Sequence, residues 1–376
     1  MKILQLALSL GAGGAERIAV SLCNRFAANA DDEIVLVTIL DDSVPRNIHY
    51  LKDLSSNVRF VNLHCKTGLQ IKAFWKVFRT IKRERPDLVH CHTLAMLLLF
   101  PSLLIPRVCY FHTIHTLAQK AMEKYSLPKR MIMNYLFRQN KVKPITISKT
   151  CHQSFYETYK NSNDICIPNG SERLAVTEEV ESVKKEVESL KQSLNTHHSS
   201  LSTFIHIARH HPTKNHDKLF RTFLRLEKEG ERCVLIVLGE YYDSWKEKLK
   251  DSKSIFLLGA KKNVGDYMAQ ADFFVLSSDY EGLPMTLLEA MSMGVVPVST
   301  PAGGVVDVVE DGVTGYLTEN FGDEEFYRKV KQAIHEKGRI PSERIKDHFE
   351  KHFSMEVCAR NYYETYRSVV MKKNDL

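Results

Sequence analysis

The sequence predicts an α/β protein that contains two doubly wound parallel sheets. Short apolar runs alternate with segments of helical composition through both halves of the chain. Repeated strand–helix units place their strands parallel in one sheet, with helices on its faces. With 376 residues and 44% hydrophobic content, the chain is long enough for two domains, each with its own core.

Six strands are expected in the N-terminal half and five in the C-terminal half. They are Ile3–Leu8, Ile34–Leu40, Val58–Asn62, Leu88–Cys91, Val108–Phe111 and Pro144–Ile147, then, after a linker, Thr203–Ala208, Cys233–Leu238, Ile255–Leu258, Phe273–Leu276 and Val296–Ser299. Ligands of such sheets bind beyond the carboxyl ends of the strands, so a cleft between the domains is expected. In the linker, apolar residues recur in steps of four and three from Val176 to Leu194. This run favours a helix docked on its own protein over a coiled-coil dimer.

The composition of the chain indicates the cellular compartment in which the protein is expected. The sequence has no run of eighteen apolar residues, so no membrane span is expected. The start, MKILQLALSLGAGGAE, leads from an apolar run into a glycine turn, which indicates a first strand rather than a signal peptide. Eight cysteines are scattered without a CxxC pair, which favours reduced thiols in a cytosolic protein and argues against zinc.

The net charge of +7 is concentrated in the N-terminal half, where residues 1–165 hold 23 basic against 12 acidic side chains. Two segments carry most of it, 68–86 and 120–143. In the first, an apolar stripe (Ile71, Phe74, Trp75, Phe78, Ile81) and a basic stripe (Lys72, Lys76, Arg79, Arg83) follow helical spacing. Such a helix can lie on an anionic membrane surface, and a core-facing apolar stripe explains the pattern equally well. No nucleic-acid-binding motif accompanies the charge, so nucleic acid is not an expected partner.

Two glutamates mark the expected ligand site. Glu281 and Glu289 have seven residues between them and straddle the end of one strand and the start of a helix. The N–H groups at a helix start attract an anion such as a diphosphate, and carboxylates accept hydrogen bonds from hydroxyls. Together these groups indicate a nucleotide-sugar. By themselves, two glutamates at this spacing also arise by chance as solvated helix residues.

The stretch from Ser278 to Tyr316 extends this motif. Its E-x7-E pattern, with AMSMGVVPVST, GG and EDGVTGY, resembles the signature of retaining GT-B glycosyltransferases of family 4. The resemblance implies two Rossmann-like domains with an inter-domain cleft. Residues 1–168 would form the acceptor-side domain, with helix 355–370 packing back on it, and residues 169–354 the donor-binding domain. IPNG (167–170) would be the hinge entry.

The first strand–helix turn, SLGAGGAER (9–17), discriminates between two ligand classes. Glu16 stands where the third glycine of G-x-G-x-x-G would permit close helix packing, which argues against a dinucleotide-binding dehydrogenase. GGAER resembles the opening loop of family 4, where Gly13 and Gly14 would let the backbone approach the donor phosphate and the acceptor. A structural turn without a ligand is the alternative.

The segment HIARHHPTKNHDKLF (206–220) resembles the family's G-R-x-x-x-x-K-G block. Arg209 and Lys214 occupy its basic positions, and two cations there would stabilise the leaving diphosphate in place of a metal ion. A solvated surface pair is the alternative. Ala208 and Asn215 replace the block's glycines, which puts the loop's shape in doubt. The pairs Asp31-Asp32 and Asp41-Asp42 are interpreted as loop carboxylates, and no metal or other cofactor is expected.

The histidines of YFHTIHT (110–116) supply a further candidate. His112 matches the family's donor-sugar histidine, with His115 as the competing register, whereas His90 and His92 are interpreted as structural. A residue just past a strand end faces the ligand, which favours His112 over His115. Gly303 and Gly304 resemble a glycine loop near the donor, and Asp307 replaces the family's glutamate.

The resemblance implies a retaining hexosyltransferase that uses a UDP-sugar, with GDP-sugar second. It would transfer a hexose or N-acetylhexosamine to a hydroxyl of a glycan or lipid-linked saccharide, in polysaccharide synthesis at the cytoplasmic face of the inner membrane. Glu281 would bind the donor sugar and Glu289 the ribose. The other donor-binding residues would be Gly282, Leu283, Pro284, Met285 and Thr286. The alternatives are a non-hydrolysing nucleotide-sugar epimerase and a non-catalytic partner subunit.

Overall fold

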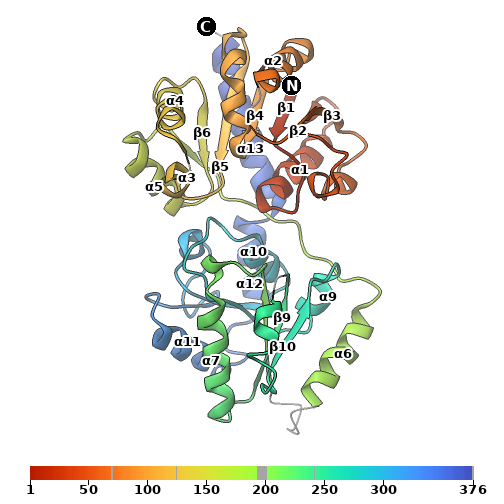
Figure 1. The fold of residues 1–376 in the computed structure, drawn as a ribbon, viewed down its shortest axis with the longest axis vertical. Helices are drawn as coiled ribbons and strands as arrows, with labels where there is room; N and C mark the ends of the chain where they lie inside the picture. The colour runs from red at the N-terminus through yellow and green to blue at the C-terminus, as the bar shows by residue number, and fades with distance from the viewer. Residues whose placement is uncertain (69–70, 124, 193–200, 241, 375–376) are drawn as a thin grey trace. The chain divides into compact units, whose positions relative to one another are not determined.

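The computed structural model describes residues 1–376 except 69–70, 124, 193–200, 241 and 375–376 (Figure 1). Leu194 and residues 69, 70 and 124 of the two basic segments therefore lie outside the described residues. The chain divides into two compact units, Met1–Gly170 with Met355–Leu376, and Ser171–Ser354. Each unit contains one parallel sheet with helices around it, so the predicted α/β class with two parallel sheets is confirmed.

In the described part of the first unit, seven parallel strands pair in the order β3-β2-β1-β4-β5-β6-β7. They are β1 (Lys2–Ala7), β2 (Glu33–Leu40), β3 (Arg59–Cys65), β4 (Leu88–His92), β5 (Cys109–Ile114), β6 (Lys143–Thr146) and β7 (Ile165–Cys166). The helices are α1 (Gly14–Phe26), α2 (Ile71–Glu84), α3 (Ala118–Glu123), α4 (Leu127–Arg138), α5 (Lys149–Tyr159) and the C-terminal α13 (Met355–Asn374), with 3-10 turns at Pro45–Asn47, Leu51–Asp53 and Thr93–Leu104. The strand order reverses between β1 and β4, which makes their carboxyl ends the expected ligand edge.

The second unit repeats this plan with six described parallel strands in the order β10-β9-β8-β11-β12-β13. They are β8 (Ser202–Ile207), β9 (Cys233–Leu238), β10 (Ile255–Gly259), β11 (Phe273–Leu276), β12 (Val296–Ser299) and β13 (Tyr316–Leu317). The helices are α6 (Val180–Gln192), α7 (His216–Lys228), α8 (Asp243–Lys246), α9 (Val264–Met268), α10 (Met285–Ser292), α11 (Asp323–His335) and α12 (Ser342–His352), with 3-10 turns at Pro212–Lys214 and Gly303–Asp307. Here the order reverses between β8 and β11.

The fifth strand is longer than the sequence predicted. The end expected at Phe111 is wrong, because β5 runs on to Ile114 with every residue buried. Its last residues pair with β6, as Thr113 does with Ile145 and Ile114 with Thr146. His112 therefore lies inside the strand and His115 directly after it. The positional argument that favoured His112 now applies to His115.

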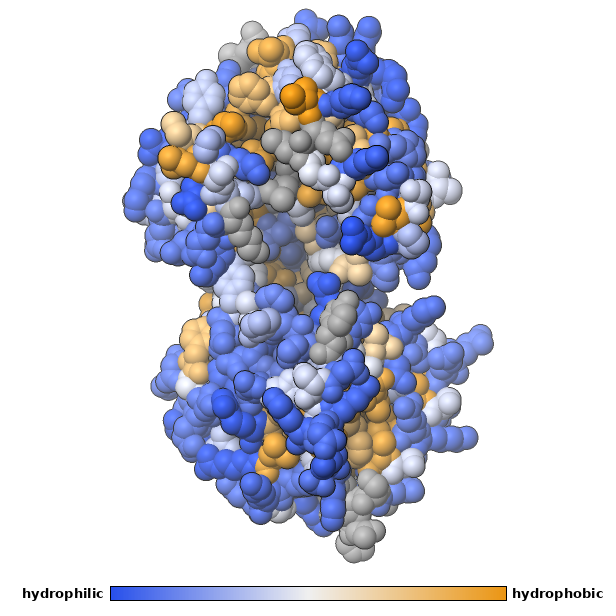
Figure 2. Space-filling view, viewed as in Figure 1, coloured by the Kyte–Doolittle hydropathy of each residue, from blue (hydrophilic) through white to orange (hydrophobic). Residues whose placement is uncertain are grey.

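Helix α2 buries only part of its apolar stripe. Ala73, Val77 and Ile81 form its core face, whereas Ile71 is 78% exposed and Trp75 is 53% exposed. In Figure 2, apolar side chains lie among charged ones on this unit's surface. Within the described ranges, no helix combines the length and the apolar character that crossing a membrane requires.

Helix α6 lies within the linker run of apolar residues. Its residues Val183 and Val187 are buried, and the helix packs on α9 of its own unit. All eight cysteines are free, and all but Cys166 are buried.

Candidate functional site

The carboxyl ends of β8 and β11 bring three predicted residues to one edge of the second sheet. Arg209 and Lys214 lie in the loop after β8, and Glu281 lies in the loop after β11. These strands are adjacent in the sheet, at the point where its order reverses. Such a point is where parallel α/β sheets bind ligands, because the loops on either side turn to opposite faces.

Lys214 and Glu281 form an ion pair in this structure. Lys214 Nζ lies 2.7 Å from Glu281 Oε1, and Ser278 Oγ donates to the same oxygen at 2.6 Å. The Glu281 side chain is 9% exposed and that of Lys214 24% exposed, so the pair lies near the surface of the loop edge. The residues expected to hold diphosphate and sugar thus contact each other, with one carboxylate oxygen receiving both donors.

The loop that carries Lys214 is held by its neighbours. Ser277 Oγ donates to the carbonyls of Lys214 and Asn215, at 2.9 and 3.1 Å. Asn215 has φ +47°, a left-handed conformation that asparagine tolerates better than most residues, and its Oδ1 caps α7 by accepting from Lys218 N. Asparagine therefore serves where the family's block has glycine. The change from glycine to Asn215 is therefore compatible with the left-handed turn that this loop requires.

The loops after β11 and β12 touch through two glycines. Gly304 N donates to the carbonyl of Gly282 at 2.7 Å. Gly303 has φ +56°, and a Cβ there would lie 1.9 Å from the carbonyl oxygen of Glu281. No other residue type fits this contact without moving the backbone that carries Glu281.

Helix α10 begins directly after this loop, at Met285. Pro284 precedes it, and no side chain caps its first turn. The first backbone N–H groups of a helix have no intrahelical partner, so those of Met285 and Thr286 can donate to an anion. Glu289 lies one turn further along the helix and is 4% exposed.

Arg209 differs from Lys214 in its surroundings. It is exposed, and it makes no ion pair or hydrogen bond with the residues that the structure describes. Its guanidinium is free to meet an incoming anion.

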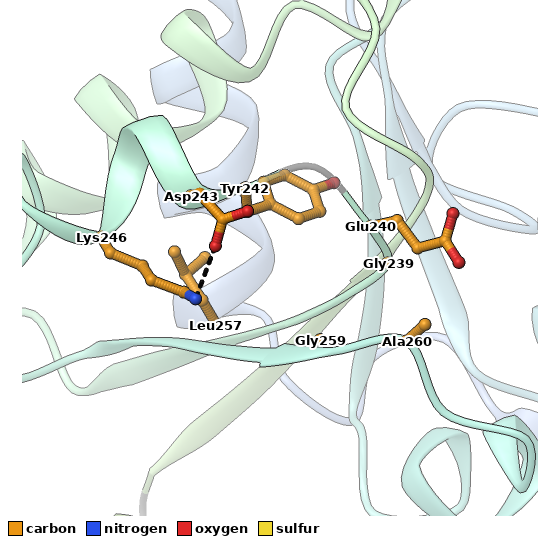
Figure 3. A pocket seen from close by; sticks show the side chains of 8 residues that line it. All are labelled: Gly239, Glu240, Tyr242, Asp243, Lys246, Leu257, Gly259 and Ala260. Atoms are coloured by element: carbon orange, nitrogen blue, oxygen red, sulfur yellow. Dashed lines mark hydrogen bonds and ion pairs between the residues drawn. The ribbon is translucent and has the colours of Figure 1, made fainter.

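A pocket that the sequence did not reveal lies at the carboxyl ends of β9 and β10 (Figure 3). It has a volume of about 390 Å³ and is lined by Gly239, Glu240, Tyr242, Asp243, Lys246, Leu257, Gly259 and Ala260. A Cβ on Gly239, at φ +149°, would lie 1.8 Å from the carbonyl oxygen of Ala208, so the loops after β8 and β9 meet there. Tyr242 donates to the same carbonyl at 2.8 Å. The sequence signal that could have indicated this pocket is a glycine at the end of each apolar strand: Gly239 directly after β9 and Gly259 as the last residue of β10.

Two buried histidines brace the β8 edge. His206 Nδ1 donates to the carbonyl of Val275 at 2.9 Å, and its Nε2 lies 3.2 Å from His216 Nε2. Burial lowers the pKa of His206 to about 4 and that of His216 to about 2, so both are neutral at physiological pH. The sequence did not indicate that His206 and His216 contact each other, because two residues ten positions apart give no periodic signal.

In the first unit, Gly13 and Gly14 open α1 after β1. Gly13 is the N-cap, and the turn before it is pinned by hydrogen bonds from Leu10 N to Asn47 O and from Tyr50 N to Leu10 O. Both glycines lie at the carboxyl edge where this sheet's order reverses. That position is compatible with a ligand and with a structural turn alike.

The four histidines in β4, in β5 and directly after β5 are all neutral. His112 is 5% exposed, its ring stacks on Phe137, and burial lowers its pKa to about 4. Burial lowers the pKa of His115 to about 3 and holds those of His90 and His92 well below the ordinary value. Among the described residues, the grouping suited to a metal ion is instead Asp41, Asp42 and His64, on the surface. His64 Nδ1 lies 3.2 Å from Asp42 Oδ1, so these loop carboxylates have a protein partner.

Two family models match the chain. One, described as Glycosyltransferase Family 4, matches residues 12–170, and the other, Glycosyl transferases group 1, matches residues 188–351. Among curated relatives, an uncharacterised glycosyltransferase of Methanocaldococcus jannaschii is 26% identical over 308 residues, 73% of each chain. N-acetyl-alpha-D-glucosaminyl L-malate synthase of Bacillus anthracis is 26% identical over 175 residues, 44% of this chain and 45% of the relative. A Vi polysaccharide biosynthesis protein of Salmonella typhi is 39% identical over 74 residues, 20% of this chain and 13% of that protein.

Solved structures match along nearly the whole chain. An Anabaena protein in complex with UDP superposes with a TM-score of 0.79 at 18% identity, covering 98% of this chain and 100% of that one. The same protein in complex with UDP-glucose gives a TM-score of 0.77. A sucrose-phosphate synthase from Thermosynechococcus elongatus gives 0.78 at 15% identity, covering 99% and 100%. At these identities the likeness establishes the fold, which is GT-B.

Proposed function

Because the chain belongs to the family 4, group 1 glycosyltransferases, we propose that it transfers a sugar with retention of configuration and without a metal ion. The donor is a nucleoside diphosphate sugar, UDP-linked in the first place and GDP-linked in the second. The sugar is a hexose or N-acetylhexosamine, and the acceptor is a hydroxyl of a glycan or lipid-linked saccharide. This chemistry serves cell-surface polysaccharide synthesis, at the cytoplasmic face of the membrane.

The Lys214–Glu281 pair, at the reversal point of the second sheet, is the observation that carries this proposal. Donor binding replaces the contact between the two side chains with contacts to substrate: Lys214 joins Arg209 on the diphosphate, and Glu281 accepts from sugar hydroxyls. The N–H groups at the start of α10 bind a phosphate oxygen, and Glu289 binds the ribose. The pocket after β9 and β10 is large enough for a nucleobase and lies along the same edge.

In the proposed reaction, the bond from the anomeric carbon to the diphosphate oxygen breaks as the acceptor oxygen bonds to the same face of that carbon. The acceptor's proton passes to the departing phosphate oxygen. Arg209 and Lys214 stabilise the charge that develops on the diphosphate, which is the largest contribution this edge can supply.

The first unit presents the acceptor in this proposal. Gly13 and Gly14 let backbone approach the substrates, and a histidine in or directly after the fifth strand, His112 or His115, contacts a sugar hydroxyl. The position of the strand end favours His115. Removing it is expected to abolish transfer while leaving UDP binding intact, since nucleotide contacts are assigned to the second unit. Loss of transfer in His112→Ala alone would restore the original assignment.

A ligand and product screen tests the proposed function. The full chain is heated with UDP, GDP and a panel of their sugars, and a ligand at a hundred times its Kd adds about 2.7 kcal/mol of stability. Stabilisation by one nucleotide-sugar, and transfer of its sugar to an added glycan or lipid-linked saccharide, is the expected result. An altered free nucleotide-sugar formed without acceptor would identify an epimerase, and no ligand effect at all would favour a partner subunit.

A further inference from the structure

A chain of hydrogen bonds runs through the interior of the first unit and joins three strands to the C-terminal helix. Its members are Gln5 of β1, His90 and His92 of β4, Thr113 of β5, His115 after β5, and Tyr362 and Tyr366 of α13. All except His115 are 0% exposed. Water does not reach these groups, so each hydrogen bond depends on its protein partner.

The direction of the hydrogen bonds follows from Gln5. Its carbonyl oxygen lies 2.8 Å from His92 Nε2, and a carbonyl can only accept, so that nitrogen carries the proton. Burial keeps the pKa of His92 well below its ordinary value, so the ring has one proton and Nδ1 is an acceptor. His115 Nε2, which lies 3.0 Å from His92 Nδ1, must then be the donor.

His115 is thereby restricted to one tautomer. Its proton is on Nε2, and its ring is neutral because burial lowers its pKa to about 3. Nδ1 carries a lone pair, is shielded from solvent, and has no hydrogen-bond partner among the residues that the structure describes. A buried acceptor without a partner is costly, and a hydroxyl from a ligand would satisfy it.

At its other end the Gln5 amide contacts helix α13. Gln5 Nε2 donates to the Tyr366 hydroxyl at 3.4 Å, and that hydroxyl donates to His90 Nδ1. His90 Nε2–H then faces Thr113 Oγ1 at 2.8 Å. Reversing the amide would reverse these hydrogen bonds and place a proton on His115 Nδ1. The state of His115 therefore depends on a residue 251 positions away in sequence, on the helix that follows the second unit.

We propose that Gln5, His92 and Tyr366 are positioning residues that hold His115 with an unprotonated Nδ1, as the acceptor for a hydroxyl group of the substrate. That the hydroxyl belongs to a sugar rests on the proposed function. The tautomer itself does not.

The tautomer can be measured directly in the full chain. Histidine ring nitrogens are labelled with 15N, long-range proton–nitrogen correlations are recorded, and the His115 signals are identified by their loss in His115→Asn. We expect Nδ1 of His115 in the unprotonated range, Nε2 in the protonated range, and a 15N–15N coupling to His92 across the hydrogen bond. A protonated Nδ1, or absence of that coupling, would overturn the proposal with no variant needed.

A matched pair of variants separates positioning from folding. Tyr366→Phe removes the hydroxyl that contacts Gln5. Tyr363→Phe removes a hydroxyl on the same helix that accepts from Asn29, which is not a member of this series of hydrogen bonds. Only Tyr366→Phe should shift the His115 signals toward a mixture of tautomers and lower kcat. Unchanged His115 signals in Tyr366→Phe would remove α13 from the proposal. If no nucleotide-sugar is turned over by any form, the NMR result still decides the tautomer, and only the proposed function fails.

Discussion

At the scale of single residues, the two basic side chains at the edge of the second sheet, Arg209 and Lys214, differ in whether they have an ion-pair partner. Lys214 is paired with Glu281, whereas Arg209 is exposed and unpaired among the described residues. Removing a preorganised charge stabiliser costs about a hundredfold or more in rate. We therefore expect Arg209→Ala and Lys214→Ala each to lower kcat by about that factor.

Steady-state kinetics with the donor found by the screen provides the measurement. Lys250→Ala is the control, because its side chain pairs with Glu247 on the surface and belongs to no proposed contact. Wild-type turnover in both site variants would remove the diphosphate assignment. A loss in Lys214→Ala alone would indicate that its main task is to hold Glu281.

The two glutamates should differ in the ligand they affect. Glu281 faces Lys214 and Ser278 at the loop edge, and Glu289 is buried in α10. In calorimetric titrations, Glu281→Ala should weaken binding of the nucleotide-sugar more than it weakens binding of the free nucleotide, because only the sugar contact is lost. Glu289→Ala should weaken both through the ribose. Equal losses for both ligands in both variants would contradict this division.

At the scale of elements, the contact between the loops after β11 and β12 depends on Gly303. A Cβ there would meet the Glu281 carbonyl at 1.9 Å in a left-handed backbone. Gly303→Ala should therefore destabilise the second unit by about 1–3 kcal/mol and weaken nucleotide-sugar binding. Gly338→Ala is the matched control, since Gly338 also has positive φ but nothing within 4 Å of an added Cβ. Denaturant unfolding and ligand titration measure both effects. An equal change in the two variants would show that backbone strain alone is responsible.

Helix α2 is predicted to bind anionic membranes through side chains that the fold leaves exposed. Ile71 and Trp75 extend from its surface beside Lys72 and Arg79, whereas Lys76 donates to the carbonyl of Leu63 at 2.6 Å. Each basic residue near an anionic surface contributes about 1 kcal/mol, and salt screens that attraction. The chain should co-sediment with anionic vesicles, not with neutral ones, and less so as salt rises.

Two variants assign that binding to the helix. Changing Lys72, Lys76, Arg79 and Arg83 together to glutamine should release the protein from the vesicles, and Ile71→Ser with Trp75→Ser should weaken the salt-resistant part. Changing Lys248 and Lys250, on the second unit, is the control. Retention unaffected by the α2 changes would exclude this helix as the anchor.

At the scale of the whole molecule, buried neutral histidines make stability depend on pH. Burial lowers the pKa values of His112 and His206 to about 4, and it holds those of His90 and His92 well below the ordinary 6.5. The unfolded chain therefore binds more protons than the folded chain as the pH falls below 6.5, so stability falls with it. Each such histidine contributes a slope of up to roughly 1.4 kcal/mol per pH unit.

The measurement is urea unfolding of each unit between pH 7.5 and 5, followed by separate probes because two units need not unfold together. His112→Gln should reduce the proton uptake of the first unit by about one. A slope that is flat from pH 7.5 to 5 would contradict the neutral buried histidines.

The sequence by itself determined the fold class, the family motif and several elements to the residue. Strands β9, β11 and β12 begin and end where predicted, because a buried parallel strand is a continuous apolar run whose signal is local. The two-residue strands β7 and β13 were missed, because two residues are too few for any periodicity. The end of β5 was misplaced because polar residues such as His112 and Thr113 are typical of a loop, and their burial follows only from the folded sheet.

Only the tertiary structure decided which side chains meet. Lys214 and Glu281 are 67 residues apart, yet one carboxylate oxygen receives the ammonium group, because β8 and β11 are neighbours across the sheet. Gln5 and Tyr366 come from opposite ends of the chain, and their contact sets the proton position on a third residue. Local sequence encodes propensity and burial, which act over a few residues. Pairing of polar groups depends on which strands become adjacent, and that follows from packing of the whole sheet.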